Sequence, residues 1–358
     1  MTETNKENQP LITTIIPTYR RPHLLKRAIT SVLNQTYPNF QVCIYDNASG
    51  DETAQIVKEI SQKDPRVHYY CHSENIGIIQ NFNFGLQQVN TPYFSFLSDD
   101  DILLPDFYEK ALEGFQKYPE AGFVATQTII ASDKKVLNIS CEDYEEKLYR
   151  SPEGLLKMIN GGTSTWTSIL FRREVIDKVG LLDEQVGSSS DLDYGLRISS
   201  VFPYAVIKSP GAIFYYNKLS LSSNWSMVEP LQWYKIILEK IRNNKDIPLS
   251  VREIAYQDFK RSIIRGIWLG GLIDVSKKRY NEAKKISQSL KNDFNENLKA
   301  NIVYNAARLC AFSDVFYYLF IGLKRIRKST NPKRRIKEKN LQKMYGQYLE
   351  YFRKYSSF

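Results

Sequence analysis

The chain has 358 residues, of which 42% are hydrophobic and 25% are charged, and its formal net charge is +10. These proportions are ordinary for a soluble protein, and the length suits one large domain with an appendage. Four scattered cysteines without CxxC spacing and only three histidines exclude a disulfide framework, a zinc site and a His-rich metal site.

The positive charge is confined to the C-terminal end. Residues 324–358 contain twelve Lys and Arg against two Glu, whereas residues 1–323 hold equal numbers of basic and acidic side chains. Residues 1–10 are polar and lack an apolar core, so we expect a disordered N-terminus without a signal peptide. No run of about 18 apolar residues occurs, so no spanning helix is predicted and we expect a reduced, cytoplasmic protein.

Strands and helices alternate through the first hundred residues. The expected strands are Leu11–Pro17, Phe40–Tyr45, Val67–Cys71 and Pro92–Leu97, and the expected helices are Pro22–Asn34, one that ends near Ser61, and Ile79–Val89. This alternation predicts βαβ units, and hence a mainly parallel α/β sheet with helices on both faces. Ligands of such sheets bind beyond the carboxyl ends of the strands.

The later elements are less regular and then purely helical. Helices at Asp106–Tyr118, Pro152–Ile159, Arg172–Val179 and about 190–201 are interspersed with strands at Gly122–Thr128, Ser168–Phe171 and Ala205–Lys208, and residues 132–150 read as an irregular excursion. From about residue 225 onward only helices are expected, at Pro230–Asn243, Pro248–Leu272, Tyr280–Leu290 and Asn301–Arg327. We therefore place a boundary near residue 225.

Polar residues follow each of the first four strands. They are Thr18 and Tyr19, then Asp46, then Asn75, and finally the acidic motif Asp99–Asp101. We expect these four loops to converge on one ligand site. Three consecutive carboxylates repel one another, and a divalent cation is the commonest reason to hold them at a strand end. The alternative is a solvated acidic turn before the helix that follows Pro105.

Five motifs, in this order and roughly at these spacings, resemble family 2 glycosyltransferases: PTYRR at 17–21, YDNASGDET at 45–53, NIGIIQN at 75–81, FLSDDDILLP at 96–105 and SDLDYGLR at 190–197. The resemblance covers about residues 10–215. It implies the GT-A fold, a nucleotide-sugar donor and inversion at the anomeric carbon. It also divides the first part of the chain into a nucleotide-binding half (11–105) and an acceptor half (106–225). Helical periodicity and charge add a helical C-terminal domain (226–323) and a basic tail (324–358).

The resemblance implies a metal site in the acidic motif. Asp100 would touch Mn²⁺ or Mg²⁺, Asp99 would touch the metal or the donor's ribose, and Asp101 would assist. Such a cation, held by one or two carboxylates, neutralises the diphosphate as the sugar leaves.

The other donor contacts fall in the loops after the first three strands. Pro17, Thr18 and Tyr19 would line the base, and Asp46, as an acceptor-only carboxylate, suits the ring N–H of uracil. An Asx-turn is the alternative for Asp46. Asp51 would lie near the nucleotide, although a carboxylate in the first turn of a helix also suits the helix dipole. The remaining predicted donor-binding residues are Arg21, Asn47, Asn75, Gly77 and Asn81.

Asp191 resembles the catalytic base of the family. Inversion needs one carboxylate to take the proton of the acceptor hydroxyl, and the alternative role for Asp191 is an N-cap. Trp166 and Thr165 are predicted to bind the acceptor, with a core anchor as the alternative for Trp166. Asp193 is also predicted to bind the acceptor, and a surface ion pair with Arg197 is its alternative.

These inferences favour a metal-dependent, inverting transferase that moves a sugar, UDP-linked by first choice, to a glycan or lipid-linked acceptor in bacterial polysaccharide synthesis. The apolar segment Ile302–Leu323 runs into a basic cluster, which suits peripheral contact with the anionic inner face of the cell membrane. A core helix with a solvated tail is the alternative, and nucleic-acid binding lacks any accompanying signature. Two rival functions remain, a nucleotidyltransferase and a non-catalytic, membrane-peripheral scaffold.

Overall fold

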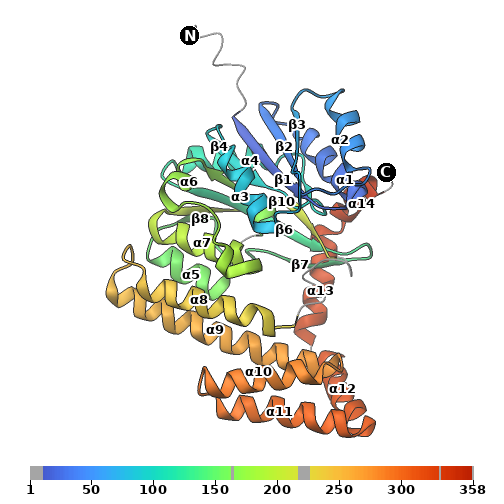
Figure 1. Ribbon diagram of the computed structural model, residues 1–358, viewed down its shortest axis with the longest axis vertical. Coiled ribbons are helices and arrows are strands. Elements are labelled where there is room, and N and C mark those ends of the chain that lie inside the picture. The colour runs from blue at the N-terminus through green and yellow to red at the C-terminus, as the bar shows by residue number, and fades with distance from the viewer. Residues whose placement is uncertain (1–10, 163–164, 217–225, 330–331, 357–358) are drawn as a thin grey trace. The chain divides into compact units, whose positions relative to one another are not determined.

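The computed structural model describes residues 11–162, 165–216, 226–329 and 332–356 (Figure 1). The chain forms two compact units. The sheet unit comprises Met1–Glu184, Ser190–Tyr216 and Leu341–Phe358, and the helical unit comprises Gln185–Ser189 and Asn217–Asn340. The predicted N-terminal disorder at 1–10 and the predicted boundary near 225 lie outside the described residues.

The sheet unit is built on one ten-stranded mixed sheet. Its strand order is β3-β2-β1-β4-β9-β6-β10-β5, with β7 paired to β6 and β8 paired to β10. The pairs β1–β2, β2–β3, β1–β4 and β6–β10 are parallel, and β9 lies antiparallel between β4 and β6. The strands are β1 (Ile12–Thr18), β2 (Phe40–Asp46), β3 (Val67–Cys71), β4 (Tyr93–Phe96), β5 (Ile102–Leu103), β6 (Phe123–Ala131), β7 (Val136–Ile139), β8 (Lys147–Tyr149), β9 (Ile169–Arg172) and β10 (Tyr204–Tyr215).

Helices cover both faces of this sheet, which confirms the α/β prediction. Side chains alternate along β1, so Ile16 faces the core beneath α1, α2 and α4, while Ile15 faces α3. Gly85 of α3 lies so close to Ile15 that an added Cβ would stand 2.7 Å from its methyl group. The helices of this part of the chain are α1 (Pro22–Leu33), α2 (Thr53–Ser61), α3 (Ile78–Gln87), α4 (Phe107–Lys117), α5 (Glu153–Gly161), α6 (Glu174–Val179) and α7 (Ser190–Val201), with short 3₁₀ turns at Trp166–Ser168 and Glu184–Ser189.

Two segments of the sheet unit differ from the sequence prediction. Residues 132–150 are not irregular, because they supply β7 and β8. Strand β10 continues past Lys208 to Tyr215, although Ser-Pro-Gly at 209–211 reads as a turn. The register of β10 shifts on both sides of Pro210, so the strand passes through a bulge, the setting in which a sheet tolerates proline.

The helical unit packs long helices side by side. Its elements are α8 (Val228–Asn243), α9 (Leu249–Ser276), α10 (Tyr280–Asn292), α11 (Asn297–Phe312) and α12 (Asp314–Ser329). An added Cβ on Gly271 of α9 would stand 2.9 Å from Val303 of α11, so glycine permits the close approach of these two helices. Within the part of the chain that is described, no helix is both long enough and apolar enough to cross a membrane.

The single helix expected over Asn301–Arg327 is two helices. Ser313 separates α11 from α12 in an extended conformation, and its hydroxyl accepts a hydrogen bond from the backbone N–H of Val315 at 3.2 Å. Serine competes with the helix for backbone groups and favours such a cap. The Ser-Asp pair at 313–314 was the available sequence signal.

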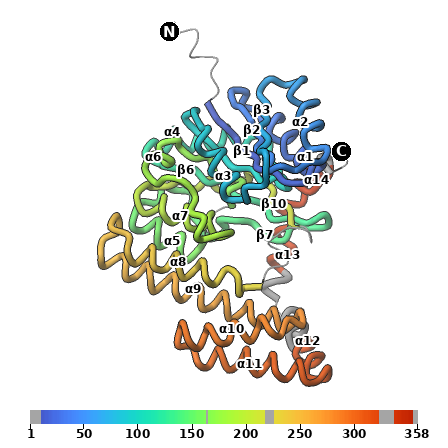
Figure 2. The backbone as a smooth tube through the Cα atoms, viewed as in Figure 1, coloured from blue at the N-terminus to red at the C-terminus, as the bar shows by residue number. Residues whose placement is uncertain are grey.

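The C-terminal residues do not form one basic tail. They form α13 (Pro332–Tyr345) and α14 (Gln347–Ser356), and α14 lies beside α1 in the sheet unit (Figures 1 and 2). Leu349 and Phe352 of α14 are 6% and 1% exposed in a core cluster with residues of β5, β6 and β10. The structure of this basic segment therefore follows from its apolar side chains at helical spacing and not from its net charge.

Candidate active site

The loops after the first three strands are tied to one another by hydrogen bonds. The backbone N–H of Asn47 donates to the carbonyl of Thr18 at 3.0 Å, and the N–H of Arg20 donates to the hydroxyl of Ser49 at 2.8 Å. The amide nitrogen of Asn47 donates to the side-chain oxygen of Asn75 at 3.0 Å. Parallel strands present their carboxyl ends at one edge, so the predicted convergence of these loops is confirmed.

The acidic motif after β4 joins the same edge. The hydroxyl of Thr18 donates to Asp99 Oδ2 at 2.9 Å. The Nη1 of Arg21 lies 3.1 Å from Asp99 Oδ1 and 3.3 Å from Asp100 Oδ2. Burial raises the pKa of Asp99 to about 6, and the charge of Arg21 opposes that rise. One guanidinium nitrogen therefore lies between two neighbouring carboxylates.

Asp101 has a structural role that the sequence did not predict. Its carboxylate is fully buried and accepts a hydrogen bond from the Thr167 hydroxyl at 2.5 Å and another from the Tyr215 backbone N–H at 2.9 Å. Burial raises its pKa, and these two donors oppose the rise. Both carboxylate oxygens are engaged inside the fold, so Asp101 links the acidic motif to the 3₁₀ turn and to β10. Its assistance to a metal stays a prediction.

A buried arginine supports the acidic motif from behind. Arg27 of α1 is 5% exposed, and its Nη2 donates to the backbone carbonyl of Asp100. Its guanidinium carbon lies 4.8 Å from the ring centroid of Tyr215 and 4.8 Å from that of Phe352. The Tyr215 and Phe352 centroids are themselves 4.7 Å apart. The last helix of the chain therefore takes part in holding the acidic motif.

The residue predicted to read a uracil base is occupied within its own loop. Asp46 is 1% exposed, its Oδ1 accepts the N–H of Ser49 at 2.9 Å, and its Oδ2 accepts the hydroxyl of Tyr69 at 2.6 Å. The contact with Ser49 is the predicted Asx-turn alternative. Asp46 therefore shapes the loop after β2, and a preference for uracil can no longer be argued from it.

Other predicted donor-binding residues divide into exposed and structural ones. Tyr19 is 38% exposed in the same loop as Arg21, and Gly77 is exposed with a φ of 87°, a conformation that favours glycine. By contrast, Asn81 is 2% exposed and bridges His72 Nε2 and the carbonyl of Tyr45.

The loop residues Pro17, Asn47 and Asp51 also have local roles. Pro17 is buried within β1, and the Asn47 side-chain oxygen accepts the N–H of Ile76 at 2.8 Å. Asp51 accepts hydrogen bonds from the backbone N–H and the hydroxyl of Thr53, at the start of α2. This is the helix-start alternative for Asp51.

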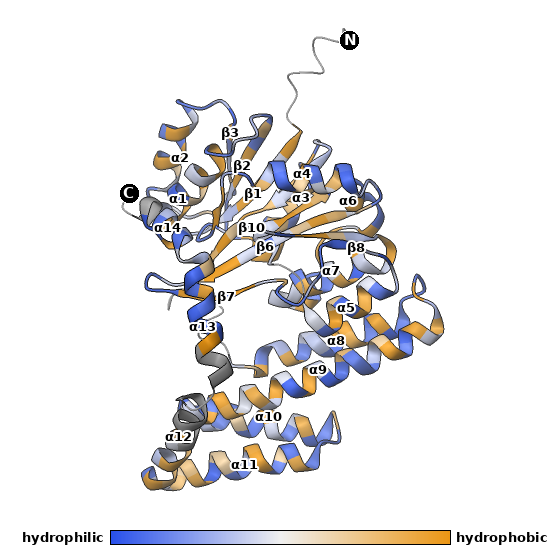
Figure 3. Cartoon of the chain, turned by 180° about the vertical axis from the view of Figure 1, so that it is seen from behind, coloured by the Kyte–Doolittle hydropathy of each residue, from blue (hydrophilic) through white to orange (hydrophobic). Residues whose placement is uncertain are grey.

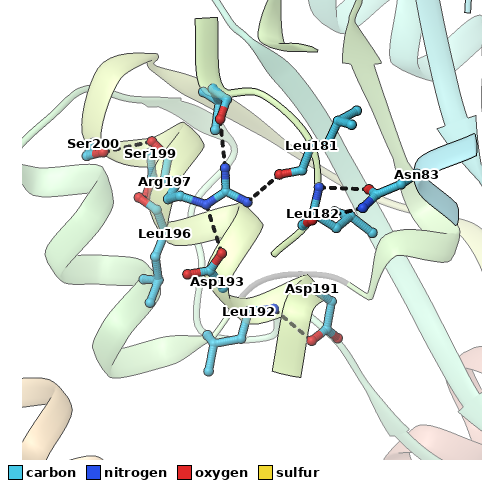
Figure 4. A network of polar contacts seen from close by, with 11 residues as sticks. Asn83, Leu181, Leu182, Asp191, Leu192, Asp193, Leu196, Arg197, Ser199 and Ser200 are labelled. Atoms are coloured by element: carbon cyan, nitrogen blue, oxygen red, sulfur yellow. Dashed lines mark hydrogen bonds and ion pairs between the residues drawn. The ribbon is translucent and has the colours of Figure 1, made fainter. Parts of the chain in front are cut away.

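The candidate base Asp191 lies in the first turn of α7 (Figure 4). Its side chain is exposed, and its Oδ1 accepts the N–H of Leu192 at 2.7 Å. Desolvation by surrounding protein atoms raises its pKa, and the backbone hydrogen bonds oppose the rise. Asp191 is therefore accessible to an acceptor hydroxyl and stays the candidate base.

Asp193, two residues further on, is buried in the network drawn in Figure 4. It is 1% exposed and accepts a hydrogen bond from Arg197 Nε at 2.8 Å. Arg197 also donates to the carbonyls of Val179 and Leu181 at 2.7 and 2.9 Å. The predicted acceptor contact of Asp193 is therefore corrected: the buried carboxylate pairs with the half-buried Arg197, and Arg197 anchors α7 to the end of α6.

Trp166 and Thr165 are packed against the sheet. The Trp166 indole stacks on Phe96 at a centroid distance of 4.6 Å and an interplanar angle of 20°, and it also contacts Phe82 and Tyr194 edge-on. Its ring is partly exposed, so it anchors the loop and keeps some surface open. The hydroxyl of Thr165 lies 2.8 Å from that of Thr128.

Asp99 and Asp100 are the residues that fit a divalent cation. Two of their carboxylate oxygens face the same cationic nitrogen, and hard oxygen ligands suit Mg²⁺ and Mn²⁺. Among the described residues no group of three or more His, Cys, Asp or Glu side chains could hold a metal ion by itself. A bound cation would therefore draw further ligands from water or from donor phosphates.

Sequence reasoning missed the partners that hold the acidic motif. Thr167 stood next to the noted Trp166 in a loop rich in hydroxyl groups, which was a usable signal. Tyr215 fell beyond the predicted end of β10. Arg27 read as an ordinary charged position on α1, and no sequence signal distinguished it.

Comparison with known proteins adds a family match. Residues 13–180 match the family model described as Glycosyl transferase family 2. An uncharacterized glycosyltransferase of Rickettsia prowazekii is 31% identical over 202 residues, which cover 54% of this chain and 61% of that protein. The GalNAc(5)-diNAcBac-PP-undecaprenol beta-1,3-glucosyltransferase of Campylobacter jejuni is 33% identical over 111 residues, which cover 30% of this chain and 36% of that protein. The chain thus spans less than two thirds of these relatives.

Solved structures share the fold. S. aureus TarS 1-349, in complex with UDP-GlcNAc, aligns with a TM-score of 0.63 at 14% identity and covers 83% of this chain and 91% of that one. The mannosyltransferase PcManGT of Pyrobaculum calidifontis, in complex with GDP-Man and Mn²⁺, aligns with a TM-score of 0.54 at 15% identity and covers 89% and 87%. At these identities the likeness shows a common GT-A-like fold.

Proposed function

Residues 13–180 match the Glycosyl transferase family 2 model, and from this match we propose that the chain transfers a sugar from a nucleotide-sugar donor to a hydroxyl of a glycan or lipid-linked acceptor. The observation that carries the proposal is the pair Asp99 and Asp100 held at the carboxyl end of the sheet by Thr18 and Arg21. A carboxylate pair at this edge suits an anionic ligand that arrives with a cation.

The reaction is a single displacement with inversion. The acceptor hydroxyl oxygen forms a bond to the anomeric carbon as the bond from that carbon to the diphosphate breaks. Asp191 takes the hydroxyl proton, and its exposure and raised pKa support that role. The nucleoside diphosphate is the leaving group and carries away the electron pair of the broken bond.

Asp99 and Asp100 would hold Mn²⁺ or Mg²⁺. When bound, the cation supplies positive charge to the leaving diphosphate. Arg21 faces the same two carboxylates, and its side chain is 31% exposed. It therefore has room to turn towards the donor phosphates when the carboxylates bind a metal. Tyr19, exposed in the same loop, would contact the nucleotide.

UDP-sugar is the donor to test first. The TarS structure holds UDP-GlcNAc, whereas PcManGT holds GDP-Man, so the fold accommodates either nucleotide. The name of the Campylobacter relative places a lipid-linked glycan among the acceptors to test. A lipid-linked acceptor would bring the enzyme to the inner face of a bacterial membrane.

The first experiment is a thermal-shift panel of UDP-, GDP-, dTDP- and CDP-sugars with Mn²⁺, Mg²⁺ or EDTA. A donor at 100 times its dissociation constant stabilises the native state by about 2.7 kcal/mol. We expect one nucleotide to raise the melting temperature only with a metal, and Asp100→Asn to abolish that rise. Asp177→Asn is the control, because this exposed carboxylate pairs with Arg173 on the surface of α6.

A second measurement separates the functions. Asp191→Asn should still bind the donor but lose transfer and donor hydrolysis. No melting shift with any nucleotide in the presence of metal would favour the non-catalytic scaffold. Release of pyrophosphate from a nucleoside triphosphate and a sugar phosphate would instead identify a nucleotidyltransferase.

A further inference from the structure

Helix α11 has two apolar stripes, and only one of them is buried. The buried stripe contains Ala300, Val303, Ala307 and Cys310. The exposed stripe recurs at intervals of three, four and seven residues, which places its members on one side of the helix. They are Leu298, Ile302, Leu309 and Phe312, which are 75%, 43%, 45% and 85% exposed. Figure 3 shows hydrophobic residues along α11.

Helix α12, which follows α11 and contacts it, also exposes apolar side chains. Val315, Phe316, Tyr318 and Leu319 are between 42% and 68% exposed in its first two turns. Together with the exposed stripe of α11 they form what we call the α11–α12 face. Monomeric soluble proteins rarely expose contiguous apolar patches of more than a few hundred Å², and larger ones mark an interaction site.

The charge of the same two helices is strongly one-sided. Between Asn297 and Ser329 the sequence has six basic residues and a single acid, Asp314. Asp314 lies 3.3 Å from Lys278 and is thereby neutralised. Arg308, next to Leu309, is exposed. Three more basic residues follow at 333–335. Lys299 pairs with Glu296 at 2.6 Å, so Arg308 and the basic residues of the sequence from 324 onward carry the excess charge. A partner that suits both the apolar face and this charge combines an apolar phase with negative charge.

We propose that the α11–α12 face docks on the anionic surface of a lipid bilayer. Burial of the exposed Phe312, Val315 and Leu319 in hydrocarbon is favourable, and a nucleic acid offers no hydrocarbon phase. Interfacial helices combine such side chains with Lys and Arg that pair with lipid phosphates. Since no described helix can cross a membrane, the face lies in the membrane surface without spanning it.

This inference rests on the proposed function in one respect: membrane docking serves the enzyme because a lipid-linked acceptor is held at the bilayer surface. It does not rest on it for its test, because vesicle binding is measured without donor or acceptor. The two proposals can therefore fail separately.

The test is sedimentation of the full-length chain with vesicles. We expect binding to phosphatidylcholine vesicles that contain phosphatidylglycerol, weak binding to phosphatidylcholine alone, and release by salt. Phe312→Asp combined with Leu319→Asp should weaken binding at least tenfold, and Arg308→Glu should weaken it on the mixed vesicles. Leu249→Asp is the matched control, because Leu249 is 76% exposed at the start of α9, outside the face.

Three results would overturn the docking surface. They are failure of the native chain to bind mixed vesicles, native-like binding by the double variant, and a native dimer that the double variant converts to a monomer, which would assign the face to self-association. Circular dichroism establishes that each variant is folded. Donor hydrolysis without vesicles is measured in parallel and should be the same in all four proteins. If hydrolysis is absent throughout while vesicle binding follows the expected pattern, the transferase proposal falls and the docking surface stands.

Discussion

Replacing Phe352 by leucine tests whether the last helix of the chain supports the acidic motif. Phe352 is 1% exposed and covers one face of the Arg27 guanidinium, whose other ring neighbour is Tyr215. Arg27 donates to the carbonyl of Asp100. Leucine keeps most of the buried area but removes the aromatic ring, so the contacts with Arg27 and Tyr215 are lost.

The expected loss follows from these two contacts. A desolvated cation–π contact contributes about 0.5–2 kcal/mol, and an aromatic pair about 0.5–1.5 kcal/mol beyond its buried area. We therefore expect Phe352→Leu to lower the free energy of unfolding by about 1–3.5 kcal/mol. If the whole cation–π contribution is lost at the acidic motif, metal-dependent donor binding weakens by about twofold to thirtyfold.

The control variant is Leu349→Ala in the same helix. Leu349 is 6% exposed in the same core cluster, and truncating a buried leucine costs about 2–5 kcal/mol. Calorimetric titration with donor and Mn²⁺ is made below the melting temperatures of both variants. We expect weaker donor binding in Phe352→Leu and native binding in Leu349→Ala. Equal effects on donor binding in the two variants would refute a positioning role for Phe352 and leave it a core residue.

Three further predictions concern Asp191 and the buried carboxylates. The base must be ionised, and desolvation raises the pKa of Asp191, so kcat/KM should fall as the pH falls through that raised pKa. This acidic limb of the pH profile should vanish in Asp191→Asn. An unchanged limb in the variant would exclude Asp191 as the base. Thr167→Val should cost about 1.5–3 kcal/mol in denaturant unfolding, because Asp101 loses a donor while buried; a loss below about 0.5 kcal/mol would contradict the tether. Arg197→Met should cost about 3–5 kcal/mol because the buried carboxylate of Asp193 loses its ion pair with Arg197, and adding Asp193→Leu should recover most of it, whereas no recovery would show that the carbonyl contacts of Arg197 dominate.

The sequence was sufficient for the elements of the first half of the sheet unit. The predicted strand Val67–Cys71 is β3 without change, and the predicted helix Pro22–Asn34 exceeds α1 by one residue. Each of these elements carries its own periodicity and its own boundary residues within about a dozen positions. Convergence of the polar loops followed from the parallel order of the strands, which fixes where their carboxyl ends lie.

The sequence was insufficient where a side chain's partner is remote in the chain. Asp46 and Asp101 read as ligand-binding residues, but their oxygens are engaged by Tyr69, by Thr167 and by the backbone of Tyr215. The residue type Asp is the same whether its carboxylate binds a metal or links two elements of the fold. The burial of the carboxylate and the hydrogen-bond donors near it decide between the two roles. The neighbouring residues in the sequence predict neither the burial nor the donors.

The sequence by itself determined the α/β class, the family motifs and the edge of the sheet at which they meet. It did so because these depend on short-range periodicity and on the order of the strands. Only the tertiary structure decided which carboxylates remain for a ligand and that α14 returns to the sheet unit to pack beside Arg27. The partners of Asp101 lie 66 and 114 residues away, and such pairings follow from how surfaces fit and which polar groups must be satisfied once water is excluded.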